Sequence, residues 1–274
     1  MRKLCYPSLE RTLASAESPT RNSYLLNADG RERLAFGIEP ATTKFPLRLA
    51  RYVAFAEFLR DELGRKGALQ LLDVGCGVGK LRLACPEDRI DFTGIDVRTT
   101  SLEIARRNGY ARLLQGNLVG ALPFADESFD ALVCSHVLEH LPNPKDLVRE
   151  ILRVLRPGGI FLMATPMSWW WNRWLRMHVL PLLVPEKKAD VLAANYGHVT
   201  FFTMSSLKAL LQDFVIEDIR GFRFFSSRHL PLENWWWYYR LNTLWGKTFP
   251  RLSADVNVAA RKPFADRPGH FPSR

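Results

Sequence analysis

The chain has few of the features that mark secreted, metal-clustered or membrane-spanning proteins. Its 274 residues include 4 cysteines, and no two of them form the CxxC pair of redox and zinc sites: Cys5, Cys76, Cys85 and Cys134. Scattered thiols are typical of a reducing compartment, where cysteine serves as a small apolar side chain. The N-terminus has no secretory apolar run, and no segment approaches the about 20 apolar residues of a membrane helix. We therefore expect a cytoplasmic protein.

The chain is rich in hydrophobic residues, positive charge and tryptophan. Hydrophobic residues make up 47% of the sequence, which is enough for a sizeable core and argues against global disorder. The net charge of +10 favours an anionic partner, such as nucleic acid, a phospholipid surface or a phosphorylated substrate. The 8 tryptophans are clustered, which makes their position more informative than their number.

Apolar segments of strand and helix type alternate along the middle of the chain. Strands are predicted at 69–74, 90–97, 111–116, 129–134 and 160–164, and helices at 47–63, 101–108 and 145–155. A further helix is expected at 205–211, with strands at 214–219 and 255–260. This alternation predicts a doubly wound α/β sheet with helices on both faces. We expect an N-terminal arm (1–45), one α/β domain (46–262) and a disordered basic tail (263–274).

The strongest local signal is a strand that ends in alternating glycines. Asp73 and Val74 lead into Gly75-Cys-Gly77-Val-Gly79, where the backbone can turn sharply and approach a ligand. Asp96 ends the next predicted strand, where a carboxylate can accept both hydrogen bonds of a ribose diol. A dinucleotide fingerprint would need a third glycine where Lys80 stands. The pattern therefore indicates a nucleoside site without a pyrophosphate cradle.

Several ordered motifs carry a family resemblance. The segments 71–79, 122–141 and 153–159 (LLDVGCGVG, LPFADESFDALVCSHVLEHL and RVLRPGG) resemble those of class I S-adenosylmethionine-dependent methyltransferases, in their small-molecule branch of type 11 and 23. The resemblance covers about residues 68–166. It implies a Rossmann-like, mostly parallel sheet with an antiparallel last strand, and S-adenosyl-L-methionine as cofactor.

The resemblance also implies roles for individual residues. The methionine moiety would be held by Asp73, Gly75, Cys76, Gly77 and Gly79, and the ribose by Asp96. Val97 and Leu118 would sandwich the adenine, and Ser135 and His136 would line the methyl-transfer site. Asn117 stands where the family usually has Asp; its carbonyl can accept the adenine amino hydrogen bond, without charge assistance.

Three histidines are further candidates for functional residues. His136 and His140 flank Glu139, but no third ligand is evident nearby in the sequence, so no metal site is expected. His140 is expected to end a helix and to pack under the following loop. His198 precedes a Phe-Thr step where similar methyltransferases of quinones, sugars and lipid-linked compounds carry a histidine, and we expect it to face the acceptor.

Two tryptophan-rich segments, 167–200 and 223–252, follow the cofactor motifs. Together with neighbouring arginines they fit an interfacial anchor on an anionic membrane. An aromatic cap over the substrate pocket, or a dimer contact, explains them equally well.

The sequence therefore predicts methyl transfer from S-adenosylmethionine to a small or lipid-linked acceptor of quinone, sugar or lipid type, at oxygen or carbon. Two alternatives stay open: an RNA methyltransferase, which would explain the charge, and a catalytically inactive protein that binds the cofactor.

Overall fold

The computed structural model describes residues 51–167, 198–222 and 240–264 in full. It also describes the backbone of residues 24–26, 32–34, 38–39, 42–43, 46–50 and 236–239. Five tryptophans of the two tryptophan-rich segments lie outside the described residues (Trp169, Trp170, Trp171, Trp174 and Trp235), as do the side chains of Trp236 and Trp237.

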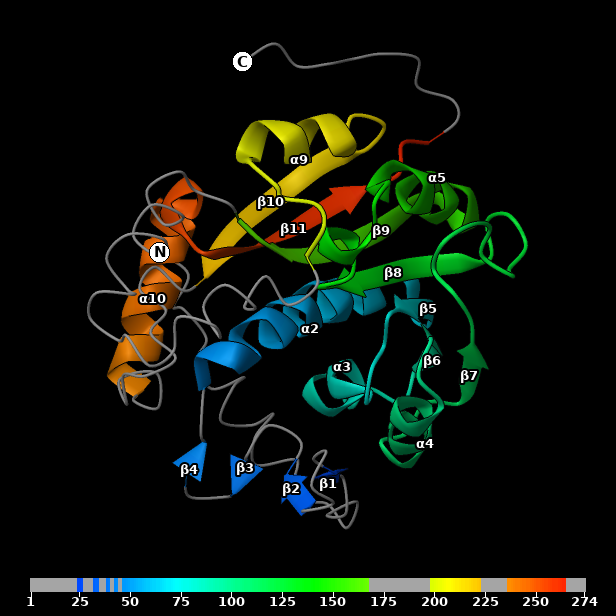
Figure 1. The fold of residues 1–274 in the computed structure, drawn as a ribbon, viewed down its shortest axis with the longest axis horizontal. Helices are drawn as coiled ribbons and strands as arrows, with labels where there is room; N and C mark the ends of the chain where they lie inside the picture. Colours follow the sequence, from blue (N-terminus) through cyan, green and yellow to red (C-terminus); the bar gives the residue numbers. More distant parts are fainter. Residues whose placement is uncertain are drawn as a thin grey trace.

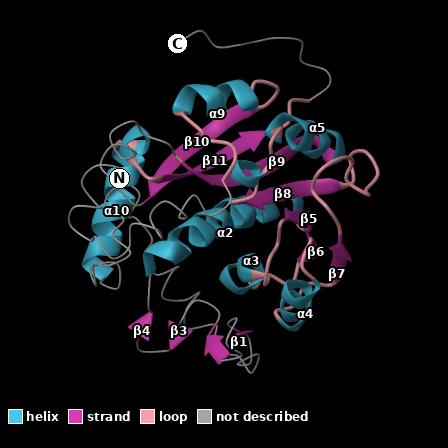
Figure 2. Ribbon diagram, viewed as in Figure 1, coloured by secondary structure: helices cyan, strands magenta, loops and turns pink. Residues whose placement is uncertain are grey.

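One seven-stranded sheet organises the chain (Figures 1 and 2). Its strands are β5 (Leu69–Val74), β6 (Ile90–Asp96), β7 (Arg112–Gln115), β8 (Phe129–Ser135), β9 (Leu155–Pro166), β10 (Val215–Phe222) and β11 (Asp255–Arg261). The strand order is β10-β11-β9-β8-β5-β6-β7. The pairs from β7 to β9 are parallel, whereas β11 is antiparallel to both of its neighbours. The predicted mostly parallel sheet with an antiparallel last strand is confirmed.

Helices cover both faces of this sheet, as predicted (Figure 1). On one face lie α2 (Pro46–Lys66), α3 (Lys80–Ala84) and α4 (Thr99–Arg107). On the other lie α5 (Pro144–Val154) and α9 (Met204–Leu210). The helix α10 (Trp236–Thr248) lies beside α2 and β10. Two short 3-10 helices complete the described set, η1 (Leu138–His140) and η5 (Pro250–Leu252).

Burial on both faces explains the unbroken apolar runs of the central strands. In β8, Leu132 and Cys134 pack on the α5 side, while Ala131 and Val133 pack on the α2 side. All four residues are fully buried. Parallel strands covered by helices on both faces read as continuous apolar segments because neither face meets water.

Some local features differ from the sequence prediction. The strand β9 begins at Leu155, because Leu155 pairs with Phe129 before an irregularity in the register. The helix α3 was not predicted, since its five residues are too few to show a helical period. Four short strands, β1 (Tyr24–Leu26), β2 (Glu32–Leu34), β3 (Ile38–Glu39) and β4 (Thr42–Thr43), lie in the stretch expected to form the arm. Among the described helices, none has the length and apolar character needed to cross a bilayer.

Candidate active site

The predicted site residues gather at one edge of the sheet because the strands β5, β6 and β8 are parallel. Their carboxyl ends therefore lie side by side, where ligands bind in doubly wound sheets. The glycine turn follows β5, Asp96 ends β6, and Ser135 and His136 come at the end of β8. Three segments that are distant in the sequence thus surround one site.

The glycine turn is fastened to the neighbouring strand. The amides of Gly75 and Cys76 both donate to the Ile95 carbonyl, at 2.8 and 3.1 Å. Gly75, Gly77 and Gly79 have φ values of 72°, 52° and 77°, in the left-handed region that glycine adopts without strain. A Cβ on Gly75 would lie 2.3 Å from Val137 Cγ2, whereas a Cβ on Gly77 would meet nothing within 4 Å. Gly75 serves close packing, while Gly77 borders open space that a ligand can enter.

Asp96 is held in a fixed orientation by this turn. Its Oδ2 accepts a hydrogen bond from the Gly77 amide at 2.9 Å, and its Oδ1 accepts one from the Arg98 amide at 2.9 Å. Each carboxylate oxygen can accept a second hydrogen bond, because the group offers about four lone-pair sites. The carboxylate is therefore positioned and still able to accept from a ribose diol.

Asp73 is buried beside the turn and forms an unexpected pair. Its Oδ2 accepts a hydrogen bond from the Tyr110 hydroxyl at 2.5 Å. Burial raises the pKa of the Asp73 carboxyl from its usual 3.8 to about 7; the Tyr110 hydrogen bond opposes this shift and the charge of Asp96 adds to it. Tyr110 was missed by sequence reasoning, since a single tyrosine between a helix and a strand carries no pattern. Burial also raises the pKa of the Cys76 thiol well above its usual value.

The predicted adenine contacts differ in exposure. Val97 is 52% exposed and Leu118 is 8% exposed. The Asn117 Oδ1 accepts a hydrogen bond from the Val119 amide at 3.1 Å, within its own turn. One of its lone pairs is therefore already used, which leaves one for an adenine amino group. The predicted roles of these three residues stay predictions.

The end of β8 carries a dense polar cluster. His136 has a φ of 56°, which is rare for a residue with a side chain, and its Nδ1 lies 3.1 Å from Glu139 Oε1. Glu139 is 1% exposed, and its Oε2 accepts a 3.5 Å hydrogen bond from Thr165 Oγ1. Within the described part of the chain, Ser135 Oγ and His136 Nε2 are buried atoms without a hydrogen-bond partner. Such atoms are suited to binding a ligand, since buried polar groups are nearly always satisfied.

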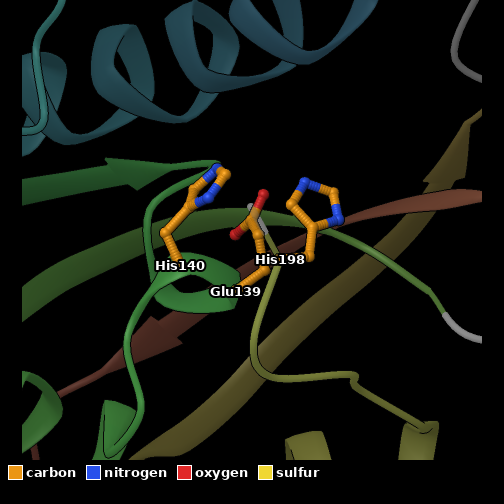
Figure 3. A group of neighbouring side chains, drawn as sticks. All are labelled: Glu139, His140 and His198. Atoms are coloured by element: carbon orange, nitrogen blue, oxygen red, sulfur yellow. The ribbon is translucent and has the colours of Figure 1, made fainter. Parts of the chain in front are cut away.

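His198 completes this cluster from a distant segment. The amides of Val199 and Thr200 donate to the Glu139 carbonyl at 2.9 and 3.0 Å, and Thr200 Oγ1 donates to the Leu141 carbonyl at 2.6 Å. The imidazole rings of His140 and His198 have centroids 4.8 Å apart. Figure 3 shows the Glu139 carboxylate between these two rings. The helix α9 follows this segment, and its N-terminus is capped by the Thr203 side chain, which accepts a hydrogen bond from the Ser206 amide.

One sequence expectation about this cluster stays a prediction and another is wrong. We saw no third candidate ligand near Glu139 and His140 in the sequence; the fold brings His198 beside them, with one potential ligand atom of each residue within 4.8 Å of the others. The 3-10 helix places Glu139 and His140 together, and only the fold brings the third group. His140 ends η1 as expected, but it is exposed rather than packed under the next loop.

Comparison with known proteins agrees with this geometry. A family model described as a methyltransferase domain matches residues 72–163. A ubiquinone biosynthesis O-methyltransferase of Psychrobacter arcticus is 30% identical over 183 residues, which cover 63% of this chain and 69% of the relative. The chain belongs to the S-adenosylmethionine-dependent methyltransferases. Its cofactor is therefore S-adenosylmethionine rather than a nicotinamide dinucleotide.

Two further similarities concern the length of the match and the fold. A ubiquinone biosynthesis O-methyltransferase of Idiomarina loihiensis is 31% identical over 156 residues, or 55% of this methyltransferase and 62% of the relative, so the match spans less than two thirds of that protein. An S-adenosylmethionine-dependent methyltransferase from Mesorhizobium loti shares the fold at 22% identity with a TM-score of 0.50. That structural match covers 75% of this chain and 96% of the solved one.

The same substitution at Gly75 and at Gly77 is expected to have different effects. Both Gly75→Ala and Gly77→Ala require a left-handed alanine, which costs about 1–2 kcal/mol. Only Gly75→Ala adds a clash with Val137, and overpacking costs about 1–3 kcal/mol more. We expect thermal unfolding to show the larger loss of stability for Gly75→Ala. Calorimetry should show weakened cofactor binding by the still folded Gly77→Ala protein. Equal losses of stability would contradict this account.

Asp73 predicts a pH dependence of folding and of cofactor binding. Because its pKa is raised in the folded state, the folded protein keeps a proton that the unfolded chain has released above about pH 4. This residue's contribution to stability therefore falls as the pH rises from about 4 to about 7, and Asp73→Asn should abolish that trend.

If the ammonium group of the cofactor binds near Asp73, binding below pH 7 releases a proton. Calorimetry in buffers of different ionisation enthalpy measures this release, and equal release by wild type and Asp73→Asn would refute the assignment.

Proposed function

We propose that this chain transfers the methyl group of S-adenosylmethionine to a small or lipid-linked acceptor of quinone, sugar or lipid type, at oxygen or carbon. The observation that carries the proposal is the polar cluster at the end of β8, directly beside the glycine turn. Val137 joins the two, because it follows His136 in the chain and packs against Gly75. The curated relatives named above support an acceptor of the quinone type and transfer to oxygen.

The main requirement of methyl transfer is the alignment of the cofactor with the acceptor, and a further requirement is removal of the acceptor's proton. Methyl transfer from a sulfonium is a direct displacement, and holding both reactants in line can supply about 7–11 kcal/mol of the barrier. The glycine turn, Asp73 and Asp96 would hold the cofactor. The unsatisfied Ser135 Oγ and His136 Nε2 would bind the acceptor, and His198 would orient it or take its proton.

The described arginines argue against an RNA substrate. Several are used in ion pairs within the fold: Arg153 with Glu150 and Asp126, Arg156 with Asp130, Arg220 with Glu57 and Asp218, and Arg261 with Glu62 and Glu217. Charge that is paired internally offers little to a phosphate backbone, whose binding depends on unpaired lysine and arginine.

The test is to incubate the full chain with methyl-labelled cofactor and three separate acceptor pools: catechol and hydroquinone compounds, a lipid extract, and RNA. We expect label in the first or second pool. The control is Asp96→Ala, which removes two charged hydrogen bonds to the ribose worth about 1.5–3 kcal/mol each. It should weaken cofactor binding at least about tenfold and reduce labelling accordingly. Label in RNA alone, or no label despite cofactor binding, would overturn the proposal.

We further propose that α10 contacts an anionic membrane surface. Its outward side carries Leu241 and Leu244, which are 53% and 58% exposed. The basic residues Arg240 and Lys247 are exposed on the same helix. Exposed leucines flanked by basic residues fit an interfacial helix, since the apolar side chains enter the acyl boundary while the charges bind lipid phosphates. A lipid-linked acceptor would then be taken directly from the bilayer.

Flotation with liposomes tests this surface. The wild type should float with phosphatidylserine vesicles at low salt and less at high salt, because screening weakens the basic contacts. The double variant Leu241→Ser/Leu244→Ser should lose binding at every salt concentration. The matched control is Val215→Ser, a 58% exposed valine at the first residue of β10, whereas α10 approaches the other end of that strand through the contact of Gly246 with Gly221. Equal flotation of the double variant and the control would refute the proposal.

A further inference from the structure

We propose that Glu139, His140 and His198 form a binding site for one divalent transition-metal ion, of which Zn²⁺ is the best fit. This inference rests on the proposed function only for what the ion does, not for its binding. In this proposal His198 orients the methyl acceptor indirectly, by binding the metal ion that the acceptor coordinates.

The donor set is the first argument. Each residue offers one ligand atom, and all three atoms lie within 4.8 Å of one another. Ligands about 2 Å from a tetrahedral zinc ion are about 3.3 Å apart, so small side-chain rotations suffice to close the set. Two imidazoles and one carboxylate suit zinc and its transition-metal neighbours, whereas Mg²⁺ and Ca²⁺ prefer oxygen ligands.

The Glu139 carboxylate supplies an independent argument. Glu139 is 1% exposed, and its Oε1 accepts no hydrogen bond from the described residues. The nearest candidate, His136 Nδ1, lies 3.1 Å away. A buried carboxylate oxygen without a donor is costly unless a cation compensates it. Its other oxygen accepts from Thr165 Oγ1. Such outer hydrogen bonds commonly orient a metal-binding carboxylate.

The backbone holds the site together. Glu139 and His140 come from the single turn η1, and the 198–200 segment is tied to that turn by two hydrogen bonds to the Glu139 carbonyl and one to the Leu141 carbonyl. The ligands are thus positioned by main-chain contacts that do not depend on the metal. The exposed His140 ring shows that one side of the site is open to solvent, which leaves room for a ligand from outside the protein.

Three protein ligands with an open position are typical of a catalytic rather than a structural zinc site. An acceptor hydroxyl that coordinates the ion ionises more readily, and its proton passes to water. The oxygen then forms a bond to the methyl carbon while the carbon–sulfur bond breaks and its electron pair returns to sulfur. The sulfonium becomes a neutral thioether, and the metal is neither oxidised nor reduced.

The test is metal binding by the full chain after dialysis against a chelator. Calorimetry with Zn²⁺ should give one site per chain, and Co²⁺ should give visible absorption bands from the bound ion. His140→Ala is the decisive variant, because an exposed side chain can be removed without disturbing the core. It should weaken Zn²⁺ binding at least about tenfold, the loss seen even for residues that only support metal ligands. Glu139→Gln and His198→Ala should do the same.

The controls are Glu103→Gln, an exposed carboxylate on α4, and His270→Ala, which lies outside the described residues. Both should bind Zn²⁺ like the wild type, and all five variants should keep the wild-type affinity for S-adenosylmethionine. Absence of Zn²⁺ and Co²⁺ binding, or binding that His140→Ala leaves unchanged, would overturn the metal site. Methyl transfer by the metal-free protein would then still support the proposed function, whereas metal binding without methyl transfer would overturn that function alone.

Discussion

The site depends on the parallel pairing of β5, β6 and β8. Parallel strands bring their carboxyl ends to one edge, and each of these three strands places predicted site residues there: the glycine turn, Asp96, and the Ser135–His140 segment. The pairing is held by two apolar clusters, one on each face of the sheet. Because those clusters bury every residue of β8 except Ser135, the residues at the end of this strand lie at fixed positions where the sheet meets solvent.

Close contacts between backbone and side chain then shape the cofactor turn. Gly75 leaves room for Val137, and Val137 belongs to the segment that carries the histidine cluster. The glycine turn and the segment that carries the histidine cluster are therefore packed directly against each other. Asp73 and Asp96 add two buried acidic groups beside the turn, and their mutual repulsion helps to raise the pKa of Asp73. A cationic cofactor bound at this turn would relieve that repulsion, so that cofactor binding and protonation of Asp73 would be coupled.

The histidine cluster arises from a different constraint. The Glu139 carbonyl, at a turn of 3-10 helix, accepts two amide hydrogen bonds from the 198–200 segment. This main-chain link places His198 against Glu139 and His140, although 57 residues lie between His140 and His198 in the sequence. The same few residues thus join the cofactor core to the segment that follows the tryptophan-rich stretch. Any ligand held by these three side chains, whether acceptor or metal, would contact both parts of the chain.

The sequence by itself determined the sheet, its helical layers and the cofactor motif, because buried strands, helical periods and left-handed glycines each leave a local pattern. It did not reveal Tyr110 beside Asp73, or His198 beside Glu139 and His140, since those contacts join residues that share no spacing. It also placed His140 under a loop, whereas the tertiary structure leaves that ring exposed and directed toward His198. Local periodicity reports burial and turns, but contacts between distant segments follow from the strand order and from hydrogen bonds that only the folded chain can form.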